Sequence, residues 1–387
     1  MLVPIHAAGW ERVQVTVGET VKIVPQGTRL VRGMLGIVRH PDGSIFVNTQ
    51  TGGLARSRDQ GKTWSLLPTE RAFALGVTRD GRLWLADHVK DSSQLVVRHS
   101  SDSGETWTTT VLDVSDLSPE SSRQPYNWTG DDYNTFIERP DGTLMFSAGL
   151  RRIPWYYEDP SLMEDGLVSP DADVGGLFLF RSRDGGKSWG EPSLVHGFAS
   201  EVGYAVDPAD SDRILAMTRI QRPLLAGEDR SETLKKTGAP ASTKSNYPSI
   251  YKNGLLLESR DGGRTFAEVP GGLTGFYEIR GTILWTADNR VVVTHQGAHP
   301  GGAPDGTLLA RISLDGGRRW LDGTATGTTA MNQSRKFVLV PMPPGHSFTA
   351  PSVQISENRF LSVYFHGNLS RNIAMVSGVF WRLEHLP

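Results

Sequence analysis

An eight-residue motif that occurs five times constrains the fold of this 387-residue chain more than any other feature. Each copy reads Ser-X-Asp-X-Gly-X-X-aromatic, and most follow a run of apolar residues that is typical of a β-strand. The Asp side chain can accept hydrogen bonds from backbone N–H groups two or three residues further on, and the Gly can adopt a positive φ, so each copy predicts a hairpin turn. The copies occupy residues 57–64, 100–107, 182–189, 259–266 and 313–320.

A second recurring element is an Asp-Gly pair between two apolar runs, as at Asp42-Gly43, Asp80-Gly81 and Asp141-Gly142. This pattern is a strong hairpin signal. A strand, an Asp-Gly turn, a strand, a loop, a strand, the octapeptide and a final strand make a four-stranded antiparallel blade. The 43 Gly and 23 Pro also favour many short strands over long helices. The sequence therefore predicts an all-β propeller.

The octapeptide resembles the Asp-box, or bacterial neuraminidase repeat, of the sialidase superfamily, and the resemblance spans nearly the whole chain. It implies a single six-bladed β-propeller domain, 1–387, with octapeptide turns between strands three and four. The last blade lacks an octapeptide, and a strand at about 10–25 is expected to complete its sheet. Such repeats occur in glycosidases, lyases, receptors and assembly factors, so they predict fold better than function. The expected blades are 32–64, 73–107, 133–189, 202–266, 277–320 and 348–382.

Unequal spacing of the octapeptides predicts where a ligand binds. Asp102 and Asp184 are 82 positions apart, whereas Asp59 and Asp102 are 43 apart. The octapeptides mark one face of the disc, and long loops gathered on the other face favour a pocket. The polar centre of the last insertion predicts a mobile loop. The insertions are 113–132, 151–174 and 221–251.

Arginines at the heads of two blades are candidates for binding a carboxylate. Arg32 resembles one member of the arginine triad of sialidases, Arg280 is a second candidate, and Arg371 or Arg219 could be the third. A guanidinium fork matches a planar carboxylate. Arg152-Ile-Pro copies a sialidase motif in the wrong blade, yet the aromatic residues after it offer flat faces to sugar rings. The other expected substrate-binding residues are Trp155, Tyr156, Tyr247, His295 and His366.

Carboxylates beside aromatic residues are candidates for acid and base catalysis, because such neighbours can separate two pKa values. Asp131, Asp132 and Tyr133 precede the first strand of blade three, and Asp87 and His88 end the second strand of blade two. Sialidases place their acid/base Asp in the corresponding loop of blade one. In this chain that loop has no carboxylate, which departs from the family pattern.

The superfamily's nucleophile is a Tyr activated by a Glu. Candidate pairs are Tyr277 with Glu278 and Tyr204 with Glu201, but neither lies in a recognisable motif. A Tyr or a neutral His could instead remove the proton next to a uronate carboxylate, which is lyase chemistry. Three functions stay open: an exo-acting glycoside hydrolase on an acidic terminal sugar, a polysaccharide or uronate lyase, and a non-catalytic glycan- or protein-binding propeller.

Composition limits the partners. The net charge of −2 gives no general field for nucleic acid, and no apolar run is long enough for a membrane helix. We expect a glycan or small acidic sugar as ligand, no cofactor, no metal and a monomer. The chain has no Cys, and its start shows no signal peptide, so a cytoplasmic protein and a mature exported chain fit equally well.

Overall fold

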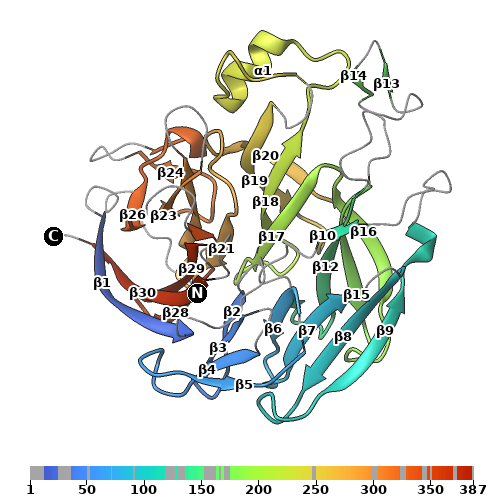
Figure 1. The fold of residues 1–387 in the computed structure, drawn as a ribbon, viewed down its shortest axis with the longest axis vertical. Helices are drawn as coiled ribbons and strands as arrows, with labels where there is room; N and C mark the ends of the chain where they lie inside the picture. The colour runs from blue at the N-terminus through green and yellow to red at the C-terminus, as the bar shows by residue number, and fades with distance from the viewer. Residues whose placement is uncertain are drawn as a thin grey trace.

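Six antiparallel sheets arranged around a common centre form the molecule (Figure 1), which confirms the predicted six-bladed propeller with four-stranded blades. Figure 1 is drawn from a computed structural model. The structure describes residues 13–24, 36–49, 53–70, 72–89, 92–117, 127–129, 136–151, 163–164, 167–169, 175–245, 250–298, 304–322, 328–341, 347–348, 351–368 and 373–385.

Blades one, two and four each contain four strands in chain order. Blade one consists of β2 (Gly36–Arg39), β3 (Ile45–Asn48), β4 (Leu54–Ser57) and β5 (Ser65–Leu67). Blade two consists of β6 (Ala74–Val77), β7 (Leu83–His88), β8 (Gln94–Ser100) and β9 (Thr108–Asp113), followed by the short helix η2 (Ser115–Leu117). Blade four consists of β17 (Ala199–Val206), β18 (Ile214–Arg222), β19 (Tyr251–Ser259) and β20 (Ala267–Leu273).

Blades three and five carry additional pieces. In blade three, β10 (Asn127–Thr129) pairs with the far half of β12. In blade five, a two-stranded sheet and the short helix η5 (Met331–Gln333) precede the fourth strand, so this blade extends beyond residue 320, where the repeat count ended it. Blade three consists of β11 (Ile137–Glu138), β12 (Leu144–Arg151), β15 (Gly175–Ser182) and β16 (Gly190–His196). Blade five consists of β21 (Thr282–Trp285), β22 (Val291–Ala298), β23 (Pro304–Ser313) and β26 (Phe337–Val340). The two-stranded sheet of β24 (Trp320–Leu321) and β25 (Thr328–Thr329) lies between β23 and β26 in the sequence.

Blade six joins two distant parts of the chain. Its strands are β28 (Ser352–Ser356), β29 (Arg359–Asn368), β30 (Ile373–His385) and β1 (Val13–Val24), with β27 (Ser347–Phe348) along the other half of β29. β1 runs antiparallel to β30. The hydrophobic core lies between neighbouring blades, as where β29 and β30 pack residues such as Leu361 and Phe380 against Ile37 and Val47 of blade one.

Each octapeptide begins where the third strand of its blade ends, and the copies share a set of hydrogen bonds, except that in the fifth Arg319 Nε replaces the hydroxyl donor to the Asp. In the first copy, Asp59 Oδ1 accepts the N–H groups of Lys62 and Thr63 at 3.0 and 2.9 Å, and its Oδ2 accepts the Thr63 hydroxyl at 2.6 Å. The hydroxyl oxygen of Ser57 accepts the N–H of Gly61 at 2.8 Å. The aromatic residue of each copy packs into the core between blades; these residues are Trp64, Trp107, Trp189, Phe266 and Trp320.

Replacing Asp59 with Ala is expected to lower the free energy of unfolding by about 1–3 kcal/mol, because several turn hydrogen bonds lose their acceptor. Burial opposes ionisation, but hydrogen bonds from Thr63, Ser57 and Lys62 lower the pKa of Asp59 to about 2. This stabilisation is therefore complete above pH 3.8, the ordinary value, and is lost as the pH falls through about 2. Denaturant titrations at pH 7 and pH 3 measure it. Lys62→Ala, at an exposed position of the same turn, is the matched control.

The octapeptides and the turns between first and second strands lie at the same end of the blades. In blade four, the N–H of Gly262 donates to the Asp212 carbonyl at 3.0 Å. Arg213, after the same turn, donates through Nη2 to the Gly316 carbonyl in the octapeptide of blade five at 2.8 Å. The beginnings of β17, β19 and β21 therefore lie at the opposite end, together with the ends of β18 and β22.

The insertion at 221–251 contains a capped helix where the sequence predicted a mobile loop. Helix α1 (Arg230–Thr237) begins after Asp229, whose side chain accepts the N–H of Glu232 at 2.8 Å, and ends at Gly238 with φ 72°. The Asn253 amide of β19 donates to the Thr237 carbonyl at 2.9 Å. The polar composition concealed an Asp N-cap and a Gly C-cap, which are the standard signals of helix ends.

The insertions of blades three and four meet outside the blades. β14 (Leu167–Val168) lies beside the segment before α1, where the N–H of Ala226 donates to the Val168 carbonyl at 2.9 Å. Figure 1 shows α1, β13 (Met163–Glu164) and β14 together at one edge of the molecule. The bidentate ion pair of Arg222 and Glu228, with both contacts at 2.7 Å, also holds this segment.

Candidate functional site

A buried glutamate between two arginines lies at the end of the blades opposite the octapeptides. Glu201, near the start of β17, forms ion pairs with Arg219 of β18 and with Arg280, which precedes β21; Arg280 Nε is 3.7 Å from Glu201 Oε1. Glu201 is only 1% exposed, whereas the Arg219 and Arg280 side chains are 14% and 18% exposed. The amide oxygens of Gln221 and Gln296 accept further hydrogen bonds from the two guanidinium groups.

Backbone irregularities aim these side chains. The pairing of β17 with β18 shifts register between Ser200 and Gly203, and Glu201 at this bulge has φ 54°. Arg280 has φ 60°. A bulge redirects a side chain, and a non-glycine residue in the left-handed region costs about 1–3 kcal/mol. Such strain is concentrated at functional sites, which makes this cluster the strongest candidate among the described residues.

One oxygen of Glu201 has unused hydrogen-bonding capacity. Glu201 Oε2 is buried and has no hydrogen-bond partner among the described residues. Because buried carboxylate oxygens are normally satisfied, this oxygen is an uncompensated acceptor beside the two arginines.

Lys252 and Tyr277 adjoin this cluster. Lys252 Nζ is 3.2 Å from the Tyr277 hydroxyl and 4.3 Å from the centre of its ring. Burial lowers the pKa of Lys252 to about 8; the charges of Arg219 and Arg280 lower it too, and Glu201 opposes them. Three cationic side chains thus surround one carboxylate, so the site carries an excess of positive charge that suits an anionic ligand.

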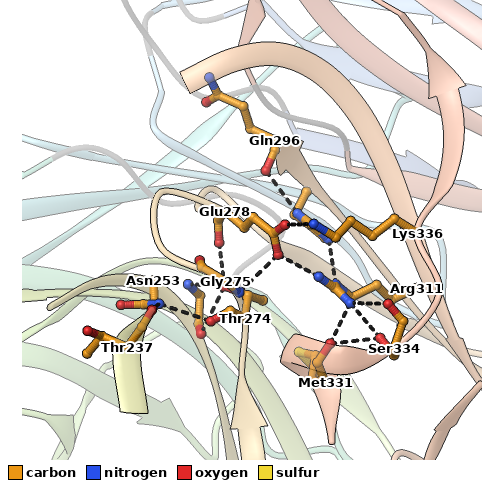
Figure 2. A network of polar contacts seen from close by, with 12 residues as sticks. Thr237, Asn253, Thr274, Gly275, Glu278, Gln296, Arg311, Met331, Ser334 and Lys336 are labelled. Atoms are coloured by element: carbon orange, nitrogen blue, oxygen red, sulfur yellow. Dashed lines mark hydrogen bonds and ion pairs between the residues drawn. The ribbon is translucent and has the colours of Figure 1, made fainter. Parts of the chain in front are cut away.

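A second network, shown in Figure 2, supports the loop that carries Tyr277 and Arg280. Arg311 Nη2 donates to Glu278 Oε2 at 2.5 Å, Lys336 forms an ion pair with the other oxygen, and the Gly275 N–H donates to Oε2 at 2.9 Å. Burial opposes ionisation of Glu278, but His295, Arg311 and Lys336 lower its pKa to about 2. The loop between β20 and β21 is therefore tied to blade five.

His295 belongs to this buried network. Its Nδ1 lies 2.9 Å from the Gln296 carbonyl, and its Nε2 accepts the Arg311 Nε–H at 2.9 Å. Burial and the Arg311 charge together lower the pKa of His295 to about 4, although Glu278 opposes them, so the ring is neutral at pH 7. Its side chain is fully buried, so it does not line a surface as the expected substrate contact requires.

The Tyr–Glu pairs expected from the sequence do not form as expected. Tyr277 and Glu278 are adjacent, but the Tyr277 hydroxyl meets Lys252 while the Glu278 carboxylate meets Arg311 and Lys336. Tyr204 packs in the apolar core between blades three and four, with its ring 6.2 Å from that of Phe266. Tyr277 lies in a turn and has a left-handed φ of 64°, and this backbone conformation directs its side chain away from that of Glu278.

The other candidate residues predicted from the sequence do not join the Glu201 cluster within the described part of the structure. Asp87 and His88 contact each other, with His88 Nδ1 3.3 Å from Asp87 Oδ1, and the His88 ring stacks on Phe73. His366 pairs with Ser347 in blade six, but its side chain is outside the described part of the structure. The remaining candidates lie outside the described residues: Arg32, Asp131, Asp132, Tyr133, Arg152, Trp155, Tyr156, Tyr247 and Arg371.

Sequence reasoning missed Lys252, Arg311 and Lys336. A signal existed for Arg311, which interrupts the apolar strand β23 and is fully buried. A charged residue within a buried strand requires a partner, which here is Glu278. Lys252 carries no comparable signal, because a Lys at the start of a strand is ordinarily exposed.

Within the described residues, no group of three or more His, Asp or Glu side chains is placed to hold a metal ion. In the same part of the chain, no helix has the length and apolar character needed to cross a membrane.

Comparison with known proteins reveals similarity at the level of structure. No protein-family model matches the chain, and no curated protein does. A solved protein of unknown function from Dyadobacter fermentans has 17% identity and a TM-score of 0.58, over 96% of this chain and 99% of that one. This similarity shows that the two proteins share a fold.

Glycosidases are among the similar structures. The Hadza microbial sialidase Hz136 has 14% identity and a TM-score of 0.54, over 95% of this chain and 68% of that one. The Penicillium chrysogenum alpha-L-arabinanase, solved with arabinobiose, has 13% identity and a TM-score of 0.56, over 94% and 98% of the two chains. The propeller is thus one on which proteins act on different sugars.

Proposed function

We propose that this protein is a glycoside hydrolase that acts on a terminal sugar bearing a carboxylate. The observation that carries the proposal is the cluster of Glu201, Arg219, Arg280 and Lys252, in which three cations surround one buried carboxylate. Two guanidinium groups can bind a carboxylate through paired N–H donors. The glycosidases that share the fold support hydrolysis as the reaction class.

Each residue has a proposed role. Arg219 and Arg280 hold the substrate carboxylate, and Lys252 adds positive charge beside it. Glu201 is buried behind the two guanidinium groups and holds both in place. Its negative charge also stabilises the oxocarbenium-like transition state of glycoside cleavage.

The contact between Lys252 and Tyr277 favours a second candidate, a uronate lyase. An amine 3.2 Å from a phenol could accept its proton, and the phenolate could then remove the proton next to a carboxylate. A panel of acidic glycosides, followed by product mass and ultraviolet absorbance, separates the candidates. Hydrolysis adds water, whereas β-elimination creates an absorbing conjugated double bond. Binding without turnover would instead indicate a glycan-binding propeller.

Arg280→Lys is expected to lower kcat/KM for an acidic glycoside about 30- to 150-fold, nearly as much as Arg280→Ala, because Lys cannot supply two parallel donors. The same glycoside with its carboxylate amidated should be a poor substrate of the wild type and lose little more in the variants. Arg183→Lys, at an exposed pair with Glu191 on the octapeptide face, is the control. Additive losses from the mutation and the amidation would mean that Arg280 does not bind the carboxylate.

A further inference from the structure

Lys252 has surroundings that are unusual for a lysine. Lys252 of β19 lies opposite Gln221 of β18, whose amide oxygen accepts from Arg219, and its amine contacts Tyr277 in the loop that also carries Arg280. The charges of Glu201, Arg219 and Arg280 all act on it. Counting full charges, the three cations and one carboxylate give the cluster a charge of +2. The amine lies against the Tyr277 ring and hydroxyl, partly shielded from water.

We propose that Lys252 is a carbamylation site, where its neutral amine adds carbon dioxide and becomes a carbamate. The nitrogen lone pair forms a bond to the carbon of CO2 while one C–O double bond opens to a carboxylate. The amine loses one proton to solvent, so the atoms and charges balance without an oxidant, a reductant or a metal.

The surroundings favour both the reactant and the product. The reaction requires the uncharged amine, and with a pKa of about 8 Lys252 supplies far more of it at pH 7 than an ordinary lysine with a pKa of 10.5. The product is a planar carboxylate next to two guanidinium groups, which bind such groups well. Lys252 changes from +1 to −1, so the charge of the cluster falls from +2 to zero.

Carbamylation has a functional consequence that rests on the proposed function. The carbamate would occupy the same guanidinium donors as the carboxylate of a substrate. Dissolved CO2 should therefore compete with an acidic sugar at this site, whereas a sugar without a carboxylate should be unaffected.

Carbon-13 NMR of the full chain in ¹³C-labelled bicarbonate tests the modification directly and requires no sugar. We expect a carbamate resonance in the wild type, its loss in Lys252→Arg, and its retention in Lys187→Arg, an exposed lysine of the third octapeptide. Below pH 8 the protonated amine must release two protons to become the carbamate, so at constant dissolved CO2 and low occupancy the intensity should fall about a hundredfold for each unit of pH. The terminal amine of the chain gives a signal common to all variants and serves as an internal reference.

Two outcomes would overturn the proposal: the absence of any carbamate resonance beyond that of the terminal amine, and an unchanged resonance in Lys252→Arg. A folded Lys252→Arg protein, verified by its circular dichroism and melting temperature, excludes loss of structure as the explanation. The NMR measurement involves no glycoside, so its result is independent of the proposed function. A carbamate resonance can appear although no acidic glycoside is cleaved, and it can be absent although an acidic glycoside is cleaved.

Discussion

Glu201→Gln is expected to lower kcat/KM on an acidic glycoside about 100- to 1,000-fold, the range typical of losing one group that stabilises charge in the transition state. The substitution keeps the size of the side chain and an oxygen that accepts hydrogen bonds from Arg219, but it removes the negative charge. The charge matters most when the sugar ring becomes positive, so the decrease should appear in kcat more than in KM.

Steady-state kinetics with melting curves test this prediction. Glu268→Gln is the matched control, because Glu268 is half-exposed and pairs with His196 and Lys236, which are not members of the cluster. A folded Glu201→Gln protein with the wild-type kcat would place Glu201 outside the chemistry. A large increase in KM alone would instead indicate that it only orients the arginines.

Arg311→Leu is expected to lower the free energy of unfolding by about 3–5 kcal/mol, because it leaves the buried Glu278 without its main partner. Arg311 is fully buried and also donates to the carbonyl and hydroxyl of Ser334 at 2.9 and 2.5 Å. Chemical denaturation at pH 7 measures the change.

A double variant separates charge from packing. Arg311→Leu combined with Glu278→Leu removes both partners and should recover part of the loss, since two apolar side chains can replace a buried pair. Arg183→Ala, which removes an exposed pair with Glu191, should leave the melting temperature unchanged. A loss below about 1 kcal/mol for Arg311→Leu would mean that Lys336 alone can satisfy Glu278.

The blades could be predicted from sequence because their signals are local. Asp59 bonds to residues three and four positions away, so the turn is visible within eight residues of sequence. Such turns mark five of the six blades, and the sixth, which has no octapeptide, was predicted from its apolar runs and from the family resemblance. The fourth strand of blade five escaped prediction because β24 and β25 separate it from its octapeptide.

The candidate site was only partly predictable, because its geometry depends on contacts between distant residues. Glu201, Arg219 and Arg280 were all candidates, but nothing in their spacing indicates that they form one cluster. The bulge in β17 that aims Glu201 has no sequence signal of its own. Tyr277 and Glu278 show the converse, because neighbours in sequence contribute to different networks.

The pairing of β1 with β30 imposes an order on biosynthesis. β1 is made before the first five blades, but its partner strand lies at 373–385, so the strand must wait on the ribosome until blade six has been translated. Throughout that interval its backbone is an open edge that can pair with strands of other nascent chains. A chain that stops before residue 373 can never close its ring. Truncated products of this protein should therefore aggregate or be degraded instead of surviving as smaller propellers.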